Sequence, residues 1–248
     1  MTPLSLLILA ALLCGVYSSD ERLVNMKWKV LNSNVKSGDY NTSIGVDLVE
    51  KLTNDAAECL TKDGKNLVAT PRSFYNSKVD INATTTMSKA SVYEFLTHSD
   101  GIFEGCPACS DTPYTQLANA FVYLTANSFW SGKIWISVMK SSNDGWTDDV
   151  QTNKNFFINI VGNCLEFSLY GLDCGVFSSI DDWEKIFGST DWSYNESNLP
   201  LWYSHNDGDH SFSDFVQFGG YSKPYGKQFS TNDNICGVNV NFDYFPNR

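Results

Sequence analysis

The chain has 248 residues, and its 28 acidic residues outnumber 17 Lys and Arg, which gives a formal net charge of −11 at pH 7. Nucleic acids and anionic membranes or cell walls are bound through basic patches, so this charge argues against all of them as partners at neutral pH. A polyanionic polymer would have to be held by local contacts or in an acidic setting. The length suits a single domain with one large core.

Residues 1–18 have the character of a secretory signal peptide. Leu4 to Leu13 form an apolar run too short to span a bilayer, and small residues follow at Ser18 and Ser19. We therefore expect secretion, either to the outside of the cell or into a secretory or digestive vesicle. Residues 19–40 are polar without a clear period, so we expect them to form an N-terminal extension. Residues 41–248 are expected to form the folded domain. No later segment is apolar enough for a transmembrane helix.

Strands and helices are expected to alternate along most of this domain. Hydrophobic periodicity predicts strands at 44–48, 66–70, 101–103, 133–139, 175–177 and 199–204, and helices at 52–60, 85–96, 113–124, 156–165 and 180–186. Three more strands are expected at 215–218, 227–229 and 238–242, joined by loops too short for helices. This order predicts an α/β fold: a single, modified TIM-like β/α barrel with an irregular C-terminal part made only of strands.

Cysteines and sequons fit a secreted glycoprotein. Of seven cysteines, Cys14 lies in the signal, and the others are Cys59, Cys106, Cys109, Cys164, Cys174 and Cys236. An even number in a secreted chain predicts three disulfides, whose pairing the sequence leaves open. The pair Cys106 and Cys109 superficially looks like a redox motif, but a structural disulfide role is favoured. Glycosylation is expected at the sequon residues Asn41, Asn82 and Asn195.

Several segments in fixed order carry a family resemblance. They are Gly45-Val46-Asp47, Arg72 with Lys78-Val79-Asp80, the Cys106 to Cys109 loop, Gly175 to Ser178 with Trp183, Leu199 to Tyr203, Phe218 to Tyr221, Lys227 to Phe229, and Cys236 to Pro246. Together they resemble the secreted lysozymes of glycoside hydrolase family 25, especially the nematode and amoeba branch. The resemblance implies a modified β/α barrel with a substrate groove at the carboxyl ends of its strands, and peptidoglycan N-acetylmuramidase activity in family members. No cofactor or metal is expected, and with only His98, His205 and His210 available a zinc site is disfavoured.

The residues at the family's catalytic positions differ from the family pattern. The resemblance implies an Asp-x-Glu at the end of the 133–139 strand, where the Glu protonates the glycosidic oxygen, but this chain has Ser137 and Met139. Met has no exchangeable proton, and Ser cannot supply a negative charge. The last strand usually carries an Asp two residues before an Asn, and here the residues are Asn241 and Asp243. Asp47 is the one family carboxylate that is retained.

Each of these positions has a functional and a structural interpretation. Asp47 is either a functional carboxylate at the barrel mouth or a rim residue that holds neighbouring strands by hydrogen bonds. Ser137 and Met139 either fill the former acid pocket or reshape it for another ligand. Glu104 and Asp243 are alternative acids, although a solvated loop carboxylate is the commoner role for Glu104.

Glycan contacts are expected from Arg72 and from aromatic residues. Trp202, Tyr203 and Tyr221, with Phe74, could stack on sugars, although aromatic residues in strands more often belong to a core. Arg72 could hold an anionic group or pair with a carboxylate of the barrel. The stretch Asp207 to His210 hints at metal binding but lacks the spacing of a calcium loop, so an ordinary turn is expected.

The leading hypothesis is a secreted, lysozyme-like pseudoenzyme of innate immunity. It would be monomeric and would bind bacterial cell-wall glycan or another polysaccharide, with hydrolysis lost because Met139 stands at the general-acid position. The alternative is an active muramidase with a rearranged set of carboxylates. A third hypothesis, a purely structural or signalling protein, predicts no saturable glycan binding.

Overall fold

The computed structural model describes residues 43–246, apart from residue 94 and the segments 96–99, 128–131, 141–144 and 195–198. The expected signal peptide and N-terminal extension lie outside the described residues, as do the sequon residues Asn41 and Asn195. Among the described residues, none of the helices combines the length and the apolar character needed to cross a membrane.

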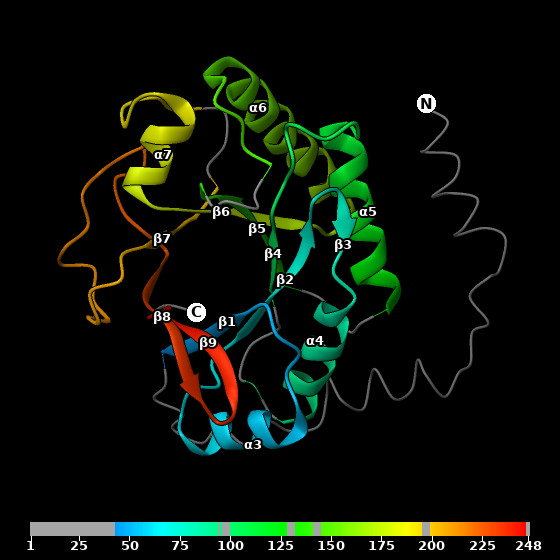
Figure 1. Ribbon diagram of the computed structural model, residues 1–248, viewed down its shortest axis with the longest axis vertical. Helices are drawn as coiled ribbons and strands as arrows, with labels where there is room; N and C mark the ends of the chain where they lie inside the picture. Colours follow the sequence, from blue (N-terminus) through cyan, green and yellow to red (C-terminus); the bar gives the residue numbers. More distant parts are fainter. Residues whose placement is uncertain are drawn as a thin grey trace, which may run out of the picture. The chain divides into compact units, whose positions relative to one another are not determined.

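The sheet of the described residues closes into a barrel. Its strands are β1 (Ile44–Leu48), β2 (Ala69–Tyr75), β3 (Lys78–Val79), β4 (Gly101–Phe103), β5 (Lys133–Val138), β6 (Asp173–Ser178), β7 (Leu201–Ser204), β8 (Gly226–Ile235) and β9 (Val238–Tyr244). Their order is β1-β9-β8-β7-β6-β5-β4-β2-β3, and an additional pairing of β1 with β2 closes eight strands, with β3 appended as a hairpin (Figure 1). Within the closed barrel, the pairings among β1, β2, β4, β5, β6, β7 and β8 are parallel, whereas β9 is antiparallel to both β8 and β1. The appended β3 is antiparallel to β2. The expected α/β barrel is therefore present.

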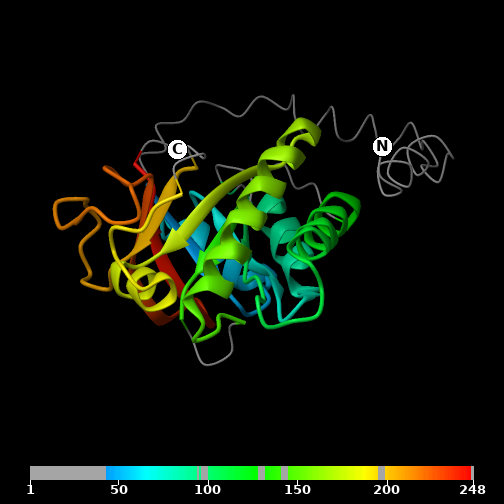
Figure 2. The same ribbon diagram turned by 90° about the horizontal axis from the view of Figure 1, so that it is seen from above.

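Helices connect the parallel strands on the outside of the barrel. They are α3 (Asn54–Lys62), α4 (Asn82–Val92), α5 (Pro113–Asn127), α6 (Val150–Phe167) and α7 (Ile180–Phe187), with a short 3-10 turn η1 (Ser168–Tyr170) after α6. Side-chain caps start three of them: Thr53, Asp149 and Ser179 each accept a hydrogen bond from a backbone N–H of the first turn. Figure 2 shows α6 lying along the outside of the strands next to α5.

Two expected strands are wrong in detail. Residues 215–218 form no strand, and only Phe218 makes an isolated bridge, to Tyr221. The apolar alternation that suggested a strand is used for ring packing instead: Phe215 lies edge-on to Tyr203, and Phe218 to Trp183. The strand expected at 66–70 starts at Ala69 and continues through Pro71 to Tyr75, and its register against β4 is irregular between Arg72 and Phe74.

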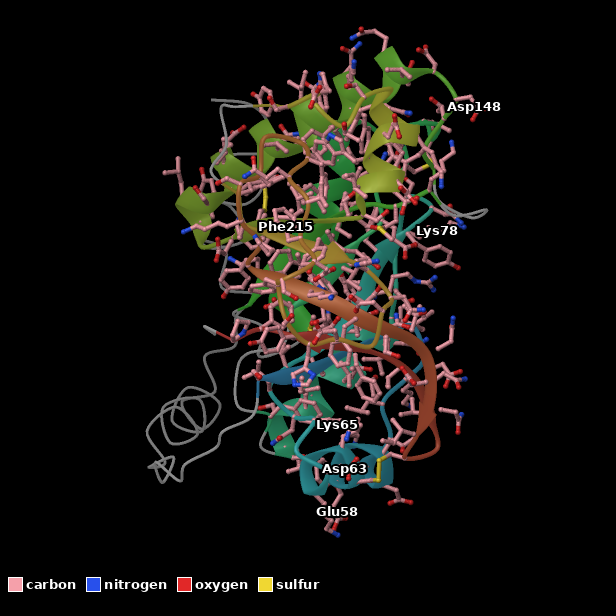
Figure 3. The ribbon with its side chains drawn as sticks, turned by 90° about the vertical axis from the view of Figure 1, so that its left-hand side faces the viewer. Glu58, Asp63, Lys65, Lys78, Asp148 and Phe215 are labelled. Atoms are coloured by element: carbon pink, nitrogen blue, oxygen red, sulfur yellow. A yellow bond between two sulfur atoms is a disulfide. The ribbon has the colours of Figure 1, made fainter. Side chains whose placement is uncertain are left out.

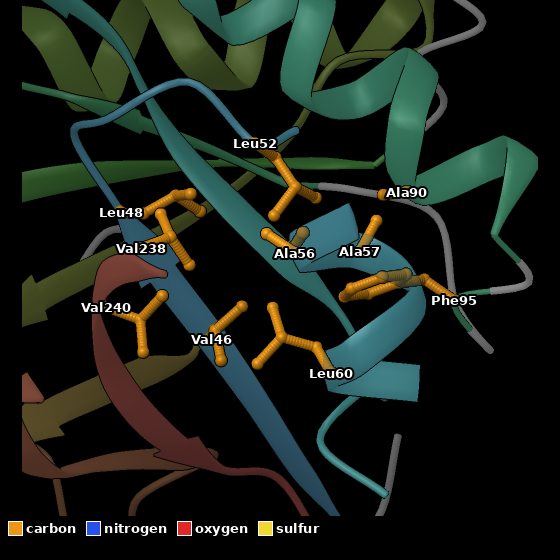
Figure 4. Packing of buried hydrophobic residues seen from close by; sticks show 11 residues of the cluster. Val46, Leu48, Leu52, Ala56, Ala57, Leu60, Ala90, Phe95, Val238 and Val240 are labelled. Carbon is orange, nitrogen blue, oxygen red and sulfur yellow. The ribbon is translucent and has the colours of Figure 1, made fainter. Parts of the chain in front are cut away.

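Alternation along β1 and β9 divides the side chains between two cores. Val46 and Leu48 of β1 point outward and pack with Val238 and Val240 of β9 against α3 (Figure 4). Successive side chains of a strand point to opposite faces, so Asp47 faces the barrel interior.

The lower interior of the barrel is filled by aromatic rings. Trp135, Phe177, Trp202 and Phe245 form one buried cluster, in which the ring centroids of Trp135 and Trp202 are 5.6 Å apart. A Cβ atom on Gly175 would lie 2.3 Å from the Trp135 ring, so only glycine fits there. The interior below the mouth is therefore a packed core and not a pore.

The six described cysteines form three pairs. Cys59 of α3 pairs with Cys236 in the β8–β9 turn, Cys106 with Cys109, and Cys164 of α6 with Cys174 of β6. Figure 3 shows a disulfide beside α3, near the labelled Asp63. The Gln116 side chain accepts from the Cys106 N–H (2.9 Å) and donates to the Cys106 carbonyl (3.0 Å), which holds the Cys106 loop against α5.

Candidate active site

Asp47 lies near the carboxyl end of β1, inside the barrel, and is only 4% exposed. In the register, it is paired with Thr70 of β2 on one side and with Asn241 of β9 on the other. Paired residues of adjacent strands have their side chains on the same face. Asp47, Thr70 and Asn241 therefore form one polar layer that faces the barrel interior.

Both oxygens of the Asp47 carboxylate accept hydrogen bonds from amides. Gln228 Nε2 donates to Oδ2 at 2.7 Å, and Asn241 Nδ2 donates to Oδ1 at 2.7 Å. Ser204 Oγ in turn donates to Gln228 Oε1 at 2.8 Å, which fixes the direction of the Gln228 amide. The orientation of Asp47 thus depends on contacts from β7, β8 and β9.

Burial has the largest effect on the pKa of Asp47. Loss of contact with water raises its pKa from 3.8 to about 6, although hydrogen bonds with Gln228, Asn241 and Asp243 oppose this shift. Asp243 itself is fully buried and is paired with Gly45, one layer deeper than Asp47. A carboxyl group with a pKa near 6 can be protonated in a mildly acidic setting.

The tip of β5 presents the two residues at the family's other catalytic positions. Ser137 is buried, and its carbonyl accepts a hydrogen bond from Trp146 Nε1 at 3.2 Å. Met139 follows β5 directly, is half-buried, and packs against the aromatic cluster of the lower barrel. Neither side chain ionises, so β5 contributes no carboxylate at the position where the family resemblance implies the acid.

Glu104 lies on the neighbouring strand at a similar level. It follows β4 directly, and because Phe103 is paired with Ile136, Glu104 comes next to Ser137 in the register. Its N–H donates to the Phe74 carbonyl at 2.9 Å, which keeps this residue in the strand direction beyond the end of β4. The structure therefore brings Glu104 to the β5 side of the mouth.

The expected glycan contacts need correction. Trp202 is fully buried in the aromatic cluster, and Tyr203 is buried with its hydroxyl donating to Asp214 Oδ1 at 2.8 Å, so neither offers a ring face to a sugar. Arg72 pairs with Asp80, with Nη2 2.9 Å from Oδ2, and stacks on the Tyr75 ring. Tyr221 is half-buried beside Trp183, and stays a candidate.

A second polar cluster lies outside the barrel interior and includes Asp207, from the stretch Asp207 to His210. The fully buried Lys227 of β8 places its Nζ 2.8 Å from Asp207 Oδ2 and 2.9 Å from Asp214 Oδ1, and Asp214 also bonds His205 and Tyr203. Burial opposes ionisation of both carboxyls, but hydrogen bonds, above all those from Lys227 and His205, hold the pKa values of Asp207 and Asp214 below their usual range.

This cluster is better explained as a clamp than as a metal site. Ligand atoms of His205, Asp207 and Asp214 lie within 4.8 Å of one another, which is close enough to consider an ion. However, the Lys227 ammonium already supplies the positive charge between the two carboxylates. The chain bends at Asp207 and Gly208, where Gly208 has a φ of 75° and the Asp209 N–H donates to Asp207 Oδ1 at 2.9 Å. Only the spatial approach of residues 207, 214 and 227 identifies the cluster.

The chain is similar in sequence to lysozyme-like proteins. The family model described as "Lysozyme-like protein 1" matches residues 38–229. A curated relative, the probable GH family 25 lysozyme 4 of Dictyostelium discoideum, is 28% identical over 213 residues, which cover 85% of this chain and 93% of the relative.

Two solved structures share the fold. The muramidase from Trichobolus zukalii is 16% identical with a TM-score of 0.61, covering 82% of this chain and 93% of its own. The bacterial lysozyme from Streptomyces coelicolor is 14% identical with a TM-score of 0.61, covering 84% and 93%. The match of the family model over most of the sequence, together with the closed barrel, leads to one conclusion: the chain belongs to the lysozyme-like proteins of glycoside hydrolase family 25.

Proposed function

We propose that this protein is a secreted, monomeric, lysozyme-like protein that binds bacterial cell-wall glycan, or a related polysaccharide, in innate defence, with little or no hydrolysis. One observation carries the proposal: Ser137 and Met139 occupy the tip of β5, where the family resemblance implies the catalytic pair. A general acid typically contributes about 10²–10⁴-fold to the rate, and a thioether cannot replace it.

The hydrogen bonding of the Asp47 carboxylate supports glycan binding at the barrel mouth. An ionised carboxylate offers about four acceptor positions, and the amides of Gln228 and Asn241 use one on each oxygen. Asp243 hydrogen-bonds the same carboxyl group, and the remaining acceptor capacity suits a sugar hydroxyl group. The three disulfides support secretion, because such bonds persist in oxidising compartments. The net charge of −11 predicts that a polyanionic wall is bound better in mild acid than at neutral pH.

The test combines a lysis assay with a binding assay. Turbidity of bacterial cell walls is followed from pH 4 to pH 7, and co-sedimentation with insoluble peptidoglycan is measured on the same preparation. We expect saturable binding without clearing of the suspension. Lysis that disappears in Asp47→Ala would overturn the proposal of lost hydrolysis, and absence of saturable binding at every pH would overturn the glycan-binding role.

A second candidate function is an active glycosidase with a rearranged set of carboxylates. The observation that favours it is the pKa of Asp47, about 6, together with its hydrogen bond to the buried Asp243 and the place of Glu104 beside Ser137. If lysis is measured, Glu104→Gln and Asp243→Asn should each reduce it strongly. A lytic activity that neither substitution changes would exclude this rearrangement.

A further inference from the structure

A groove runs along the outer wall of the barrel, between the β2–β3 hairpin and α5. It is a surface groove that is open to solvent, with a volume of about 480 Å³. Figure 1 shows β3 beside α5, and Lys78 lies at the edge of the molecule in Figure 3. The groove is formed by the outer faces of these elements, whereas Asp47 faces the barrel interior.

The helix side of the groove alternates amide and aromatic groups. Asn119, Tyr123 and Asn127 are spaced four residues apart on α5, so they share one face of the helix. Tyr123 is partly exposed, and the neighbouring Val122 is 50% exposed. Asn127 Nδ2 donates to the Tyr123 carbonyl at 3.0 Å, which leaves further donor and acceptor capacity on its amide. An aromatic ring between amides suits a sugar, whose C–H face packs on the ring while its hydroxyls bond the amides.

The hairpin side of the groove contributes a positive charge. Lys78 is exposed at the start of β3, and within the described part of the chain no ion pair involves it. The preceding turn is fixed, because Ser77 Oγ donates to Asp111 Oδ2 at 2.7 Å in the loop before α5. Lys78 is thus held across from Tyr123 by a tethered turn. In a chain of net charge −11, this is the kind of local basic contact that binding of an anionic polymer requires.

We propose that the groove is a second glycan-binding site, specific for oligosaccharides that carry a carboxylate, such as the lactyl group of a muramyl residue. The sugar ring packs on Tyr123 and Val122, its hydroxyls bond Asn119 and Asn127, and the carboxylate pairs with Lys78. The inference rests on the proposed function in that both sites take cell-wall glycan, but it concerns a separate surface with its own residues.

Binding titrations with two soluble probes of equal length test the proposal. One is a muramyl-containing peptidoglycan oligosaccharide, and the other is the neutral chitooligosaccharide. We expect the full chain to prefer the carboxylated probe. Tyr123→Ala should weaken the binding of both probes about tenfold, because the stacking face is lost. Lys78→Gln should remove only the preference for the carboxylated probe and the salt dependence of that preference. Asn119→Ala, at an exposed position, should weaken both probes without any effect on folding.

Matched controls and a mouth variant separate the two sites. Lys223→Gln and Tyr170→Ala change an exposed lysine and an exposed tyrosine elsewhere and should alter nothing. If Asp47→Asn abolishes binding while the groove variants bind normally, the second site is refuted and the proposed function stands. If the groove variants lose binding and Asp47→Asn retains it, the groove is the glycan site. If no variant and no unmodified protein binds either probe, both proposals fail.

Discussion

At the residue scale, the protonation of Asp47 links the site to stability. Its pKa in the folded state is about 6, above the ordinary value of 3.8, because burial disfavours the charged form. The folded protein therefore holds this proton more tightly than the unfolded chain does. Asp47 contributes stability that is fully present below about pH 3.8 and is lost as the pH rises through about 6.

The substitution Asp47→Asn removes this titration and gives the first prediction. A shift of roughly two pKa units corresponds to about 3 kcal/mol. The free energy of unfolding of the variant, relative to the original protein, should therefore improve by about that amount between a pH below about 3.8 and neutral pH. Urea unfolding at both pH values measures it, and any constant loss from the altered hydrogen bonds cancels in the comparison. An equal difference at both pH values would mean that Asp47 titrates normally.

The tip of β5 gives a second prediction, a gain of function. Ser137→Asp combined with Met139→Glu installs the catalytic pair that the family resemblance implies, beside an Asp47 already held by Gln228 and Asn241. Lysis of cell walls should rise by at least about 10²-fold above the original protein. The matched control, Ser137→Asn with Met139→Gln, has similar shapes without carboxyl groups and should remain inactive. If the double variant folds and binds glycan but still does not lyse cell walls, another residue of the barrel mouth must be responsible for the missing activity.

At the element scale, the segment 205–225 replaces the helix that would otherwise join β7 to β8. Its attachment depends on Lys227 of β8, which is fully buried and holds Asp207 and Asp214 of this segment. Removal of one member of such a group leaves buried charges without a partner. The resulting loss of stability is larger than the stability that the ion pair itself contributes. The clamp therefore acts as the anchor of the longest irregular connection next to the barrel mouth.

Lys227→Met tests this anchor. The two carboxylates would face each other without the ammonium, and we expect a loss of about 3 kcal/mol at neutral pH, the low end for a broken buried pair because both carboxylates keep some contact with water. Asp207 and Asp214 have lowered pKa values, so the clamp's stability is present above their ordinary pKa and lost as the pH falls. The loss should shrink in strong acid. Denaturant unfolding measures it, Lys223→Met is the exposed control, and a loss independent of pH would indicate a packing effect instead.

At the scale of the whole molecule, periodicity predicted most elements because burial repeats along the chain. Alternation around Val46 and Leu48 located β1 and put Asp47 on the inner face. Contacts between distant segments could not be predicted from the sequence. Gln228 donates a hydrogen bond to Asp47, 181 positions away, and no local pattern indicates that pair. The alternation of aromatic residues at 215–218 predicted a strand wrongly, because aromatic rings can pack against the outside of the barrel without their backbone joining the sheet. Periodicity likewise does not distinguish the two roles weighed for Trp202, a stacking face for sugars or a core residue, and the structure shows the core role.

The longest covalent link in the fold supports the last prediction. Cys59 and Cys236 are separated by 177 residues and join α3 to the β8–β9 turn, whereas Cys106 and Cys109 are separated by 3. In the chain-entropy account, a disulfide stabilises by restricting the unfolded chain, and the effect grows with the loop it closes. Replacing both Cys59 and Cys236 by Ala should cost about 5 kcal/mol, and replacing Cys106 and Cys109 about 2 kcal/mol. Urea unfolding of the two double variants compares them directly. Equal losses would show that local packing, such as the Gln116 contacts with Cys106, outweighs loop closure in this barrel.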